Sequence, residues 1–261
     1  FDRCARHGEE DRAINEAAMS LLVGIGTLLD VRLPRRPEKL ICGTGAGYGA
    51  APTIDGSWNI RWVRGPLTAE LLKIPAREAV TDGAVLIGLT DEKAAVHRRG
   101  TGFMPHHATA GPAWRRVCTR AGLIYLDPTA DVCSTLRRMA GCEAIITEAM
   151  HGAIVADTLR IPWAAVTIHP KINRFKWADW CASMSVTYRP TRLPALWQNS
   201  LGPVARAKQA LKEHVIVRAL LRLSRRPPLQ LSADDRFADA FGETVSRFDK
   251  LRAELRSRSG T

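Results

Sequence analysis

Short apolar runs alternate with amphipathic helical patterns along most of the chain, and this alternation restricts the possible folds more than any other feature. Strands that alternate with helices form parallel sheets, so the pattern predicts an α/β fold. We expect two Rossmann-like domains and a helical, basic C-terminal tail. The predicted ranges are 1–100 for the first domain, 101–190 for the second and 191–261 for the tail.

The first predicted domain contains four apolar runs that indicate strands. These runs are Leu21–Ile25, Lys39–Cys42, Ile60–Val63 and Ala84–Ile87. Pro66 follows the third run, and proline is favoured at the first position of a helix, so the segment PLTAELLK is expected to be helical. The polar segment Thr90–Gly100 suggests the boundary between the domains.

A second alternating series begins after this segment. The expected strands are Thr101–Met104, Leu123–Leu126, Glu143–Thr147 and Trp163–Val166, and the expected helices are Ala113–Ala121, Asp131–Ala140 and Met150–Arg160. In the tail, apolar residues from Phe237 to Leu255 recur at helical spacing, and Ser232 is expected to cap that helix. Ligands of such folds bind beyond the carboxyl ends of the strands, so the site is expected between the two domains.

The chain carries a net charge of +12, and about half of this excess lies in one segment. Val204–Arg226 holds seven Lys or Arg residues and one Glu. This composition fits an interfacial helix on anionic lipid, or a helix that covers a domain with a solvated basic face. No zinc-binding pattern or RNA-binding aromatic motif accompanies the charge, so neither a metal nor a nucleic acid is expected. The six cysteines form no CxxC pair and are expected to be mostly buried thiols of a reducing compartment.

The segment IITEAMHGAIVADTLRIP, residues 145–162, contains the clearest candidate for chemistry. A buried strand ends there and a helix begins near Met150, which places His151 at a helix N-terminus where anions are favoured. An imidazole in this position could bind phosphate or transfer protons, and Gly152 would let a ligand approach closely. A histidine that caps or packs against the helix end is the alternative.

This segment resembles the C-terminal signature of the polysaccharide pyruvyl transferase family, in which His-Gly follows a strand and begins a helix. Further matches follow in the family's order at Val63–Leu72, Thr81–Ala84, Gly102–His107, Leu126–Pro128 and Ile161–Trp163. The resemblance covers about residues 20–190 and is closest to the bacterial exopolysaccharide branch. Two features depart from the family. A strand and an Asn-Phe-Gly-Asp-like loop ahead of Leu21 are missing, and Glu148 and Ala149 stand where some members have a basic residue.

The resemblance implies a glycosyltransferase-B-like arrangement of the two domains. It also implies phosphoenolpyruvate as donor, a cyclic ketal on a hexose as product, and no metal or cofactor. The expected acceptor is a lipid-linked oligosaccharide, so a cytoplasmic enzyme at the inner face of the cell membrane is expected. Two alternatives are a glycosyltransferase that uses a sugar nucleotide and a non-catalytic basic protein that binds membrane or nucleic acid.

Ketal formation from phosphoenolpyruvate needs cations for two anionic groups and at least one general acid or base. The expected catalytic residues are His151, Glu148 and His107. Glu148 could orient His151, act as a base for the sugar, or favour the helix start as a carboxylate. Because adjacent residues of an extended chain face opposite ways, only one of His106 and His107 is expected in the site, and His107 is preferred.

Arg64 is the first candidate for binding the donor, because it ends a strand directly before a helix that starts with proline. A surface arginine is the alternative. Lys171, Arg174 and Lys176 either clamp the donor phosphate or form a solvated loop. The expected substrate-binding residues also include His106 and Gly152, and, on the acceptor side, Gly26, Thr27 and Gly45, although their spacing alone favours tight structural turns for the last three.

Overall fold

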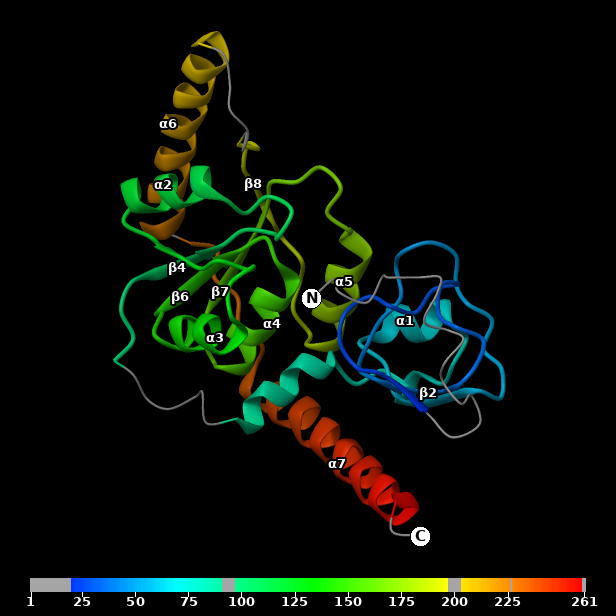
Figure 1. Ribbon diagram of the computed structural model, residues 1–261. Coiled ribbons are helices and arrows are strands. Elements are labelled where there is room, and N and C mark those ends of the chain that lie inside the picture. Colours follow the sequence, from blue (N-terminus) through cyan, green and yellow to red (C-terminus); the bar gives the residue numbers. More distant parts are fainter. Residues whose placement is uncertain (1–19, 91–96, 197–202, 226, 260–261) are drawn as a thin grey trace.

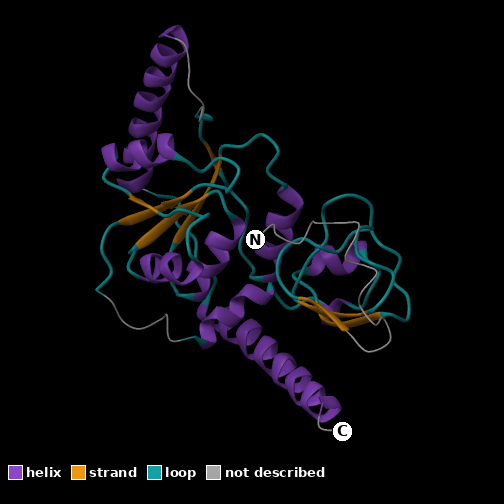
Figure 2. Cartoon of the chain, in the orientation of Figure 1, coloured by secondary structure: helices purple, strands orange, loops and turns teal. Residues whose placement is uncertain are grey.

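The computed structural model describes residues 20–90, 97–196, 203–225 and 227–259. It contains two parallel β-sheets, each accompanied by helices, and a long C-terminal helix that runs from one sheet toward the other (Figures 1 and 2). The mixed α/β class predicted from the sequence is confirmed. None of the described helices is long and apolar enough to cross a bilayer.

The N-terminal sheet has the strand order β1-β2-β3, and all its strands are parallel. Its strands are β1 (Ser20–Val23), β2 (Glu38–Cys42) and β3 (Trp58–Trp62). Helix α1 (Pro66–Leu71) follows β3 and begins at the proline, as predicted. Val23, Ile41 and Val63 form the centre of a small apolar core under α1.

The prediction of a fourth strand in this half, at Ala84–Ile87, is wrong. These residues belong to the 3₁₀-helix η3 (Gly83–Leu89), which follows the short 3₁₀-helix η2 (Ala76–Glu78). The Asp82 carboxylate accepts a hydrogen bond from the Ala84 amide and caps η3, which explains why an apolar run here is helical. Gly88 of η3 packs closely against Thr158 and Phe241, so η3 lies between the helix that begins at Met150 and the long C-terminal helix.

The C-terminal sheet has the strand order β5-β4-β6-β7-β8, and all its strands are parallel. Its strands are β4 (Thr101–Met104), β5 (Ile124–Tyr125), β6 (Ala144–Thr147), β7 (Trp163–Thr167) and β8 (Thr191–Arg192). The chain leaves β4 for β5 on one side and then returns to β6 on the other. The order therefore reverses between β4 and β6, which is where folds of this kind bind ligands.

Helices cover both faces of the C-terminal sheet, as the predicted pattern requires. They are α2 (Pro112–Arg120), α3 (Val132–Ala140) and α4 (Met150–Thr158), and each matches a predicted helix to within two residues. Ile145 packs with α3 and α4, whereas its neighbour Ile146 packs with α2 on the opposite face. The predicted strands of this half are also confirmed, and β8 is an addition that the sequence did not reveal.

The tail is helical, as predicted, and contains α6 (Pro203–Arg225), which packs against α2, and α7 (Asp234–Ser259), which runs along the N-terminal sheet (Figure 1). Ahead of the tail, helix α5 (Arg174–Ser183) packs against α1 and connects the two halves. Leu251 of α7 is buried with Leu40 and Trp62. Ser232 is not the predicted cap of α7, because its hydroxyl donates to the buried Asp157 carboxylate instead.

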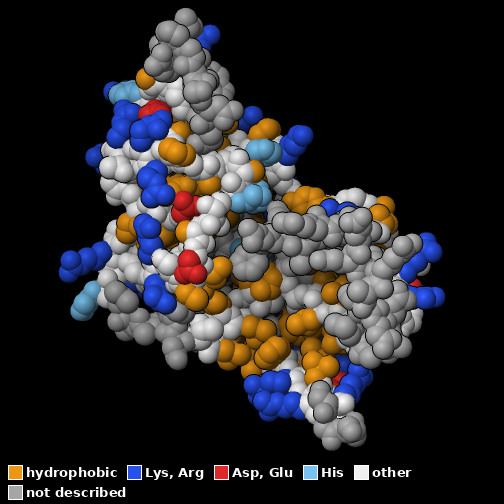
Figure 3. Space-filling view, viewed as in Figure 1, with side chains coloured by type: hydrophobic (Ala, Val, Ile, Leu, Met, Phe, Trp, Pro, Cys, Tyr) orange, Lys and Arg blue, Asp and Glu red, His pale blue; other side chains and the backbone are white. Residues whose placement is uncertain are grey.

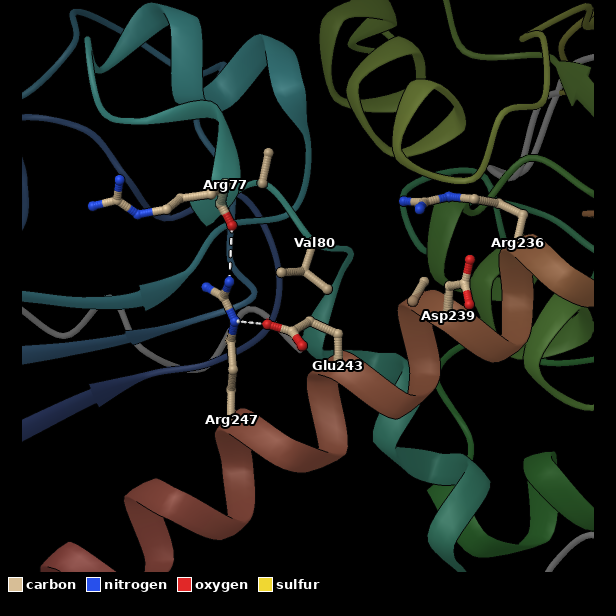
Figure 4. Close-up of a pocket in the computed structure, with 8 residues that line it drawn as sticks. Arg77, Val80, Arg236, Asp239, Glu243 and Arg247 are labelled. Atoms are coloured by element: carbon tan, nitrogen blue, oxygen red, sulfur yellow. Dashed lines mark hydrogen bonds and ion pairs between the residues drawn. The ribbon is translucent and has the colours of Figure 1, made fainter.

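A cavity of about 460 Å³ lies beside α7, lined by Arg77, Ala79, Val80, Arg236, Asp239, Ala240, Glu243 and Arg247 (Figure 4). Its arginines connect the helix to both halves. Arg247 pairs with Glu243 and Glu78, and Arg236 donates to the backbone oxygen of Ser183. The lining contains none of the predicted site residues, and its charged side chains hold neighbouring elements together through ion pairs and hydrogen bonds.

Most of the described cysteines are buried, as predicted. Cys42, Cys118, Cys142 and Cys181 are buried free thiols, and burial raises the pKa of Cys118 and of Cys181 to about 12. Cys133 is exposed on α3, so the prediction of a buried thiol is wrong there. Cys4 lies outside the described residues.

Candidate functional site

The segments that follow β4, β6 and β7 meet at one carboxylate, that of Glu148. Its side chain is fully buried directly after β6. Oε1 accepts hydrogen bonds from the amides of Ile168 (2.8 Å) and His169 (2.5 Å). Oε2 accepts from the His106 amide (3.1 Å) and from the Thr109 hydroxyl (2.6 Å). Both oxygens are therefore engaged in holding the loops after β4 and β7, and Glu148 does not contact the predicted partner His151 in this arrangement.

These four hydrogen bonds of Glu148, called the Glu148 clasp below, bring three imidazole rings together at the point where the strand order reverses. The His106 ring lies 4.0 Å from that of His107 and 6.4 Å from that of His169, measured between ring centres. His106 is half-buried and lies between the other two, whereas the preferred His107 is exposed. Sequence reasoning missed His169. Its position just after β7, the strand beside β6, was the signal that could have revealed it.

Burial lowers the pKa of His106 to about 4, and the neighbouring charges of His107 and Lys176 act in the same direction. His106 is therefore neutral at pH 7. A neutral imidazole can donate or accept a hydrogen bond, but it adds no positive charge to the cluster.

Lys176 lies between a loop of the N-terminal half and the histidine cluster. It belongs to α5, and its ammonium lies 5.8 Å from the centre of the Tyr48 ring, in the loop after β2. Asn173 caps α5 through the Lys176 amide and also donates to the backbone oxygen of Gly47. The Lys176 charge acts on both His106 and His151. By contrast, Lys171 and Arg174 are exposed at the rim of this region.

His151 lies in the first turn of α4, as predicted, and no side chain caps this helix start. Its side chain is 38% exposed, and its Nε2 faces Oδ2 of the fully buried Asp82 at 3.8 Å. Burial lowers the pKa of His151, while the Asp82 charge acts in the opposite direction. Asp82 lies in the Thr81–Ala84 turn, yet sequence reasoning gave it no role.

Gly152 serves packing in this structure, which corrects the expectation that it admits a ligand. The residue is buried, and a side chain there would collide with the Thr147 hydroxyl and the Met104 sulfur. The absence of a side chain therefore allows α4 to lie close to β4 and β6.

Arg64 is completely buried, so neither the predicted donor contact nor a surface arginine describes its surroundings. Its Nε donates to Oδ2 of Asp179 at 2.9 Å. Its Nη1 donates to the Gly26 oxygen and the Thr27 hydroxyl, and Nη2 donates to the Ala46 oxygen. The arginine thus ties α5 to the loops that follow β1 and β2.

The predicted residues Gly26, Thr27 and Gly45 are brought together by this arginine. A side chain at Gly45 would overlap the guanidinium group, so this glycine leaves room for Arg64. Sequence reasoning missed Asp179, which lies 115 residues further along the chain and also accepts hydrogen bonds from the amide and hydroxyl of Thr68. In the part of the chain that the structure describes, no group of three His, Cys, Asp or Glu side chains is arranged to hold a metal ion.

Comparison with known proteins identifies a relative of this chain. The chain is 40% identical over 182 residues to the succinoglycan biosynthesis protein ExoV of Rhizobium meliloti (strain 1021). The matched region covers 67% of this chain and 57% of the relative, so the chain spans little more than half the length of that protein. No family model matches the chain. No solved structure matches it either.

Proposed function

The chain belongs to the polysaccharide pyruvyl transferase family, and we propose that it transfers pyruvate from phosphoenolpyruvate to a hexose during exopolysaccharide biosynthesis. The product would be a cyclic ketal. The identity with the succinoglycan biosynthesis protein and the ordered motifs between residues 20 and 190 support this function. The observation that carries it is the cluster of His106, His169 and Lys176 at the switch point of the C-terminal sheet.

Phosphoenolpyruvate presents a phosphate and a carboxylate, and the cluster offers suitable partners for both. The uncapped N-terminus of α4 supplies backbone N–H groups and a favourable dipole. Lys176 supplies a positive charge next to it, and the exposed Lys171 and Arg174 are free to close over a ligand from the rim. We therefore assign the donor to this edge, with Lys176 as its main cation in place of Arg64.

The chemistry requires a proton donor beside the donor's methylene carbon. Protonation of that carbon creates a cation at C2, which a sugar hydroxyl traps by forming the first C–O bond while it loses its proton. The C–O bond to phosphate then breaks, and a second hydroxyl closes the ketal as its proton leaves. His151 is our candidate for the acid and base, since its imidazole is partly exposed at the start of α4. In this proposal Glu148 positions His106 and His169 and does not transfer protons itself, and His107 stays at the rim.

The N-terminal half would bind the acceptor, in a glycosyltransferase-B-like arrangement with a division near residue 100. Arg64 supports this role indirectly, because it fixes the loops that contain Gly26, Thr27 and Gly45. These loops lie at the carboxyl ends of β1 and β2, which is the edge that parallel sheets use for ligands.

A lipid-linked acceptor at the inner face of the cell membrane would fit the surface of α6 and α2. Lys208, Leu211, Val215, Arg218 and Arg222 are exposed and lie three or four residues apart, so they form one stripe along α6. Leu211 is 67% exposed and Val215 48%, between basic side chains. Figure 3 shows Lys and Arg side chains gathered over the region of α2 and α6. We propose that this stripe rests on anionic lipid.

The membrane proposal is tested by sedimentation with vesicles that contain phosphatidylglycerol. Replacing Lys208, Arg218 and Arg222 with glutamine should weaken vesicle binding about a hundredfold, since each basic residue near the surface contributes about 1 kcal/mol and about 1.4 kcal/mol corresponds to a tenfold change. Transfer to a soluble acceptor should be unchanged. Equal binding of both proteins to the vesicles would rule out this stripe, and binding to nucleic acid alone would favour a different anionic partner.

The transfer itself is tested with phosphoenolpyruvate labelled in its pyruvyl carbons and with oligosaccharide acceptors, in the presence of a chelator. We expect label in the sugar, phosphate release in equal amount and no effect of the chelator. His151→Ala should lower the rate about 10²- to 10⁴-fold, whereas Asp131→Ala, at the start of α3, should retain it. Transfer of a sugar from a sugar nucleotide would instead identify a glycosyltransferase.

A further inference from the structure

Asp82 and His151 face one another across the contact between η3 and α4. The distance from Asp82 Oδ2 to His151 Nε2 is 3.8 Å, which is slightly longer than a hydrogen bond. Both atoms are enclosed, and neither has a hydrogen-bond partner among the described residues. Two enclosed polar atoms of opposite character that lack other partners are costly unless they serve one another.

The two ring nitrogens of His151 differ in their surroundings. Its side chain is 38% exposed, yet Nε2 is enclosed against Asp82. The exposed part of the side chain therefore excludes Nε2, and Nδ1 is the nitrogen left to meet a ligand. In a neutral imidazole only one nitrogen carries a proton, and the partner of one nitrogen decides the state of the other.

Asp82 is held firmly enough to act as such a partner. Its Oδ1 accepts a hydrogen bond from the Ala84 amide at 2.9 Å and caps η3, which leaves Oδ2 aimed at His151. Gly83 leaves no room for a side chain, because one would collide with the backbone oxygens of Cys42 and Gly24. The turn that carries Asp82 is thus fixed against the ends of β1 and β2.

The other charges near the pair come from α5 and from the end of β3. Arg64 and Lys176 both act on His151, and Arg64 and Asp179 both act on Asp82. Burial raises the pKa of Asp82 despite the positive charges of His151 and Arg64. Burial lowers the pKa of His151, and the Asp82 charge opposes that effect. The proton affinities of the two groups are therefore brought closer together.

We propose that Asp82 is a positioning residue that holds the proton of His151 on Nε2 and so presents Nδ1 to the substrate. The carboxylate would orient the imidazole and fix its tautomer, as a buried carboxylate does for the catalytic histidine of other enzymes. The statement about Nδ1 as the reacting atom rests on the proposed function, whereas the coupling of the two side chains does not.

The coupling is tested first on the wild-type protein by long-range ¹H–¹⁵N NMR of the histidine rings, with His151→Ala to assign the signal. We expect the neutral His151 to carry its proton on Nε2. In Asp82→Asn the cap of η3 can persist through the amide oxygen, and the pKa of His151 should fall because the opposing charge is lost. Asp131→Asn, which changes the capping carboxylate of α3, is the matched control and should leave His151 unchanged. A proton on Nδ1 in the wild type, or the same His151 pKa in Asp82→Asn, would overturn the proposal.

Kinetics then separate this coupling from the proposed transfer. Asp82→Asn should lower kcat about 10- to 100-fold with little change in KM, shift the acidic limb of the pH profile, and cause no further loss when His151 is already alanine. Independent, multiplicative losses in the double variant would contradict a shared role. If no transfer is detected in any variant while the NMR result holds, the proposed function fails and the pair remains.

Discussion

The carboxyl ends of the two sheets carry similar residue types but use them in opposite ways. At the N-terminal sheet, Arg64 is enclosed, and its three nitrogens donate to groups of the protein itself. At the C-terminal sheet, His106, His169 and Lys176 are half-buried around a helix start that no side chain caps. The edge of the N-terminal sheet is closed by its own hydrogen bonds, and we call it the closed edge. The edge of the C-terminal sheet leaves polar groups available to a ligand, and we call it the open edge.

This difference shows that residue type and position in the fold do not by themselves identify a binding residue. Arg64 and His151 both follow a strand and lie near a helix start, which is why the sequence marked both. What distinguishes them is the partner. Asp179 neutralises Arg64 directly at 2.9 Å, whereas Asp82 stands 3.8 Å from His151 and leaves part of its ring exposed.

The largest effect is expected when the buried ion pair of the closed edge is removed. Asp179→Ala removes the partner of a fully buried guanidinium, and the free energy of unfolding should fall by about 3–5 kcal/mol. Denaturant unfolding measures this change. Asp249→Ala, in an exposed pair with Arg252, is the control and should change stability by less than about 1 kcal/mol. A similar small loss for both variants would show that Arg64 is not held as described.

A second substitution tests the Glu148 clasp at the open edge. Glu148→Ala leaves three amides without their acceptor and removes one of the acceptors of the Thr109 hydroxyl, so stability should fall by about 2–3 kcal/mol. Because the loops of His106 and His169 lose their anchor, affinity for phosphoenolpyruvate should fall as well. Calorimetry measures the binding. Asp179→Asn is the comparison that distinguishes an affinity lost through lower overall stability from an affinity lost through the displaced loops. Unchanged affinity in Glu148→Ala would separate these loops from the donor site.

Acid titration sharpens the comparison through His106. Its pKa is lowered to about 4 in the folded protein and lies near 6.5 in the unfolded chain, so the unfolded state binds more protons between these values. Stability should therefore fall as the pH drops from about 6.5 to 4, by roughly 1–2 kcal/mol for this half-buried ring. His106→Ala should lose less stability over the same range. Asp82, whose pKa is raised, acts in the opposite direction and is retained in both proteins.

The smallest expected effects distinguish the basic residues of the open edge. Lys176→Ala should weaken phosphoenolpyruvate binding about tenfold, or about 1.4 kcal/mol, because its half-buried charge acts on both His106 and His151. Lys171→Ala removes an exposed charge, and its effect should stay below about threefold. Calorimetric titration of both variants provides the measurement. The reverse order of effects would place the donor at the rim.

Much of the fold could be predicted because apolar runs and helix starts are local signals. The strands of the C-terminal sheet and the position of His151 follow from them directly. Ala84–Ile87 could not be distinguished in the same way, since a short apolar run suits a strand or a buried helix, and the cap by Asp82 decided the outcome. Asp179 and His169 were missed because their roles depend on contacts between segments that are distant in the sequence.

The most direct test of the open edge is a thermal-shift titration with phosphoenolpyruvate, beside phosphate, pyruvate and a panel of sugar nucleotides. At one hundred times its Kd, a ligand that binds only the folded protein stabilises it by about 2.7 kcal/mol. We predict that phosphoenolpyruvate raises Tm by roughly 5–10 °C, and that Lys176→Ala reduces this rise whereas Lys171→Ala retains it. An equal rise in wild type and Lys176→Ala, or a rise with sugar nucleotides alone, would contradict a donor site at the C-terminal sheet.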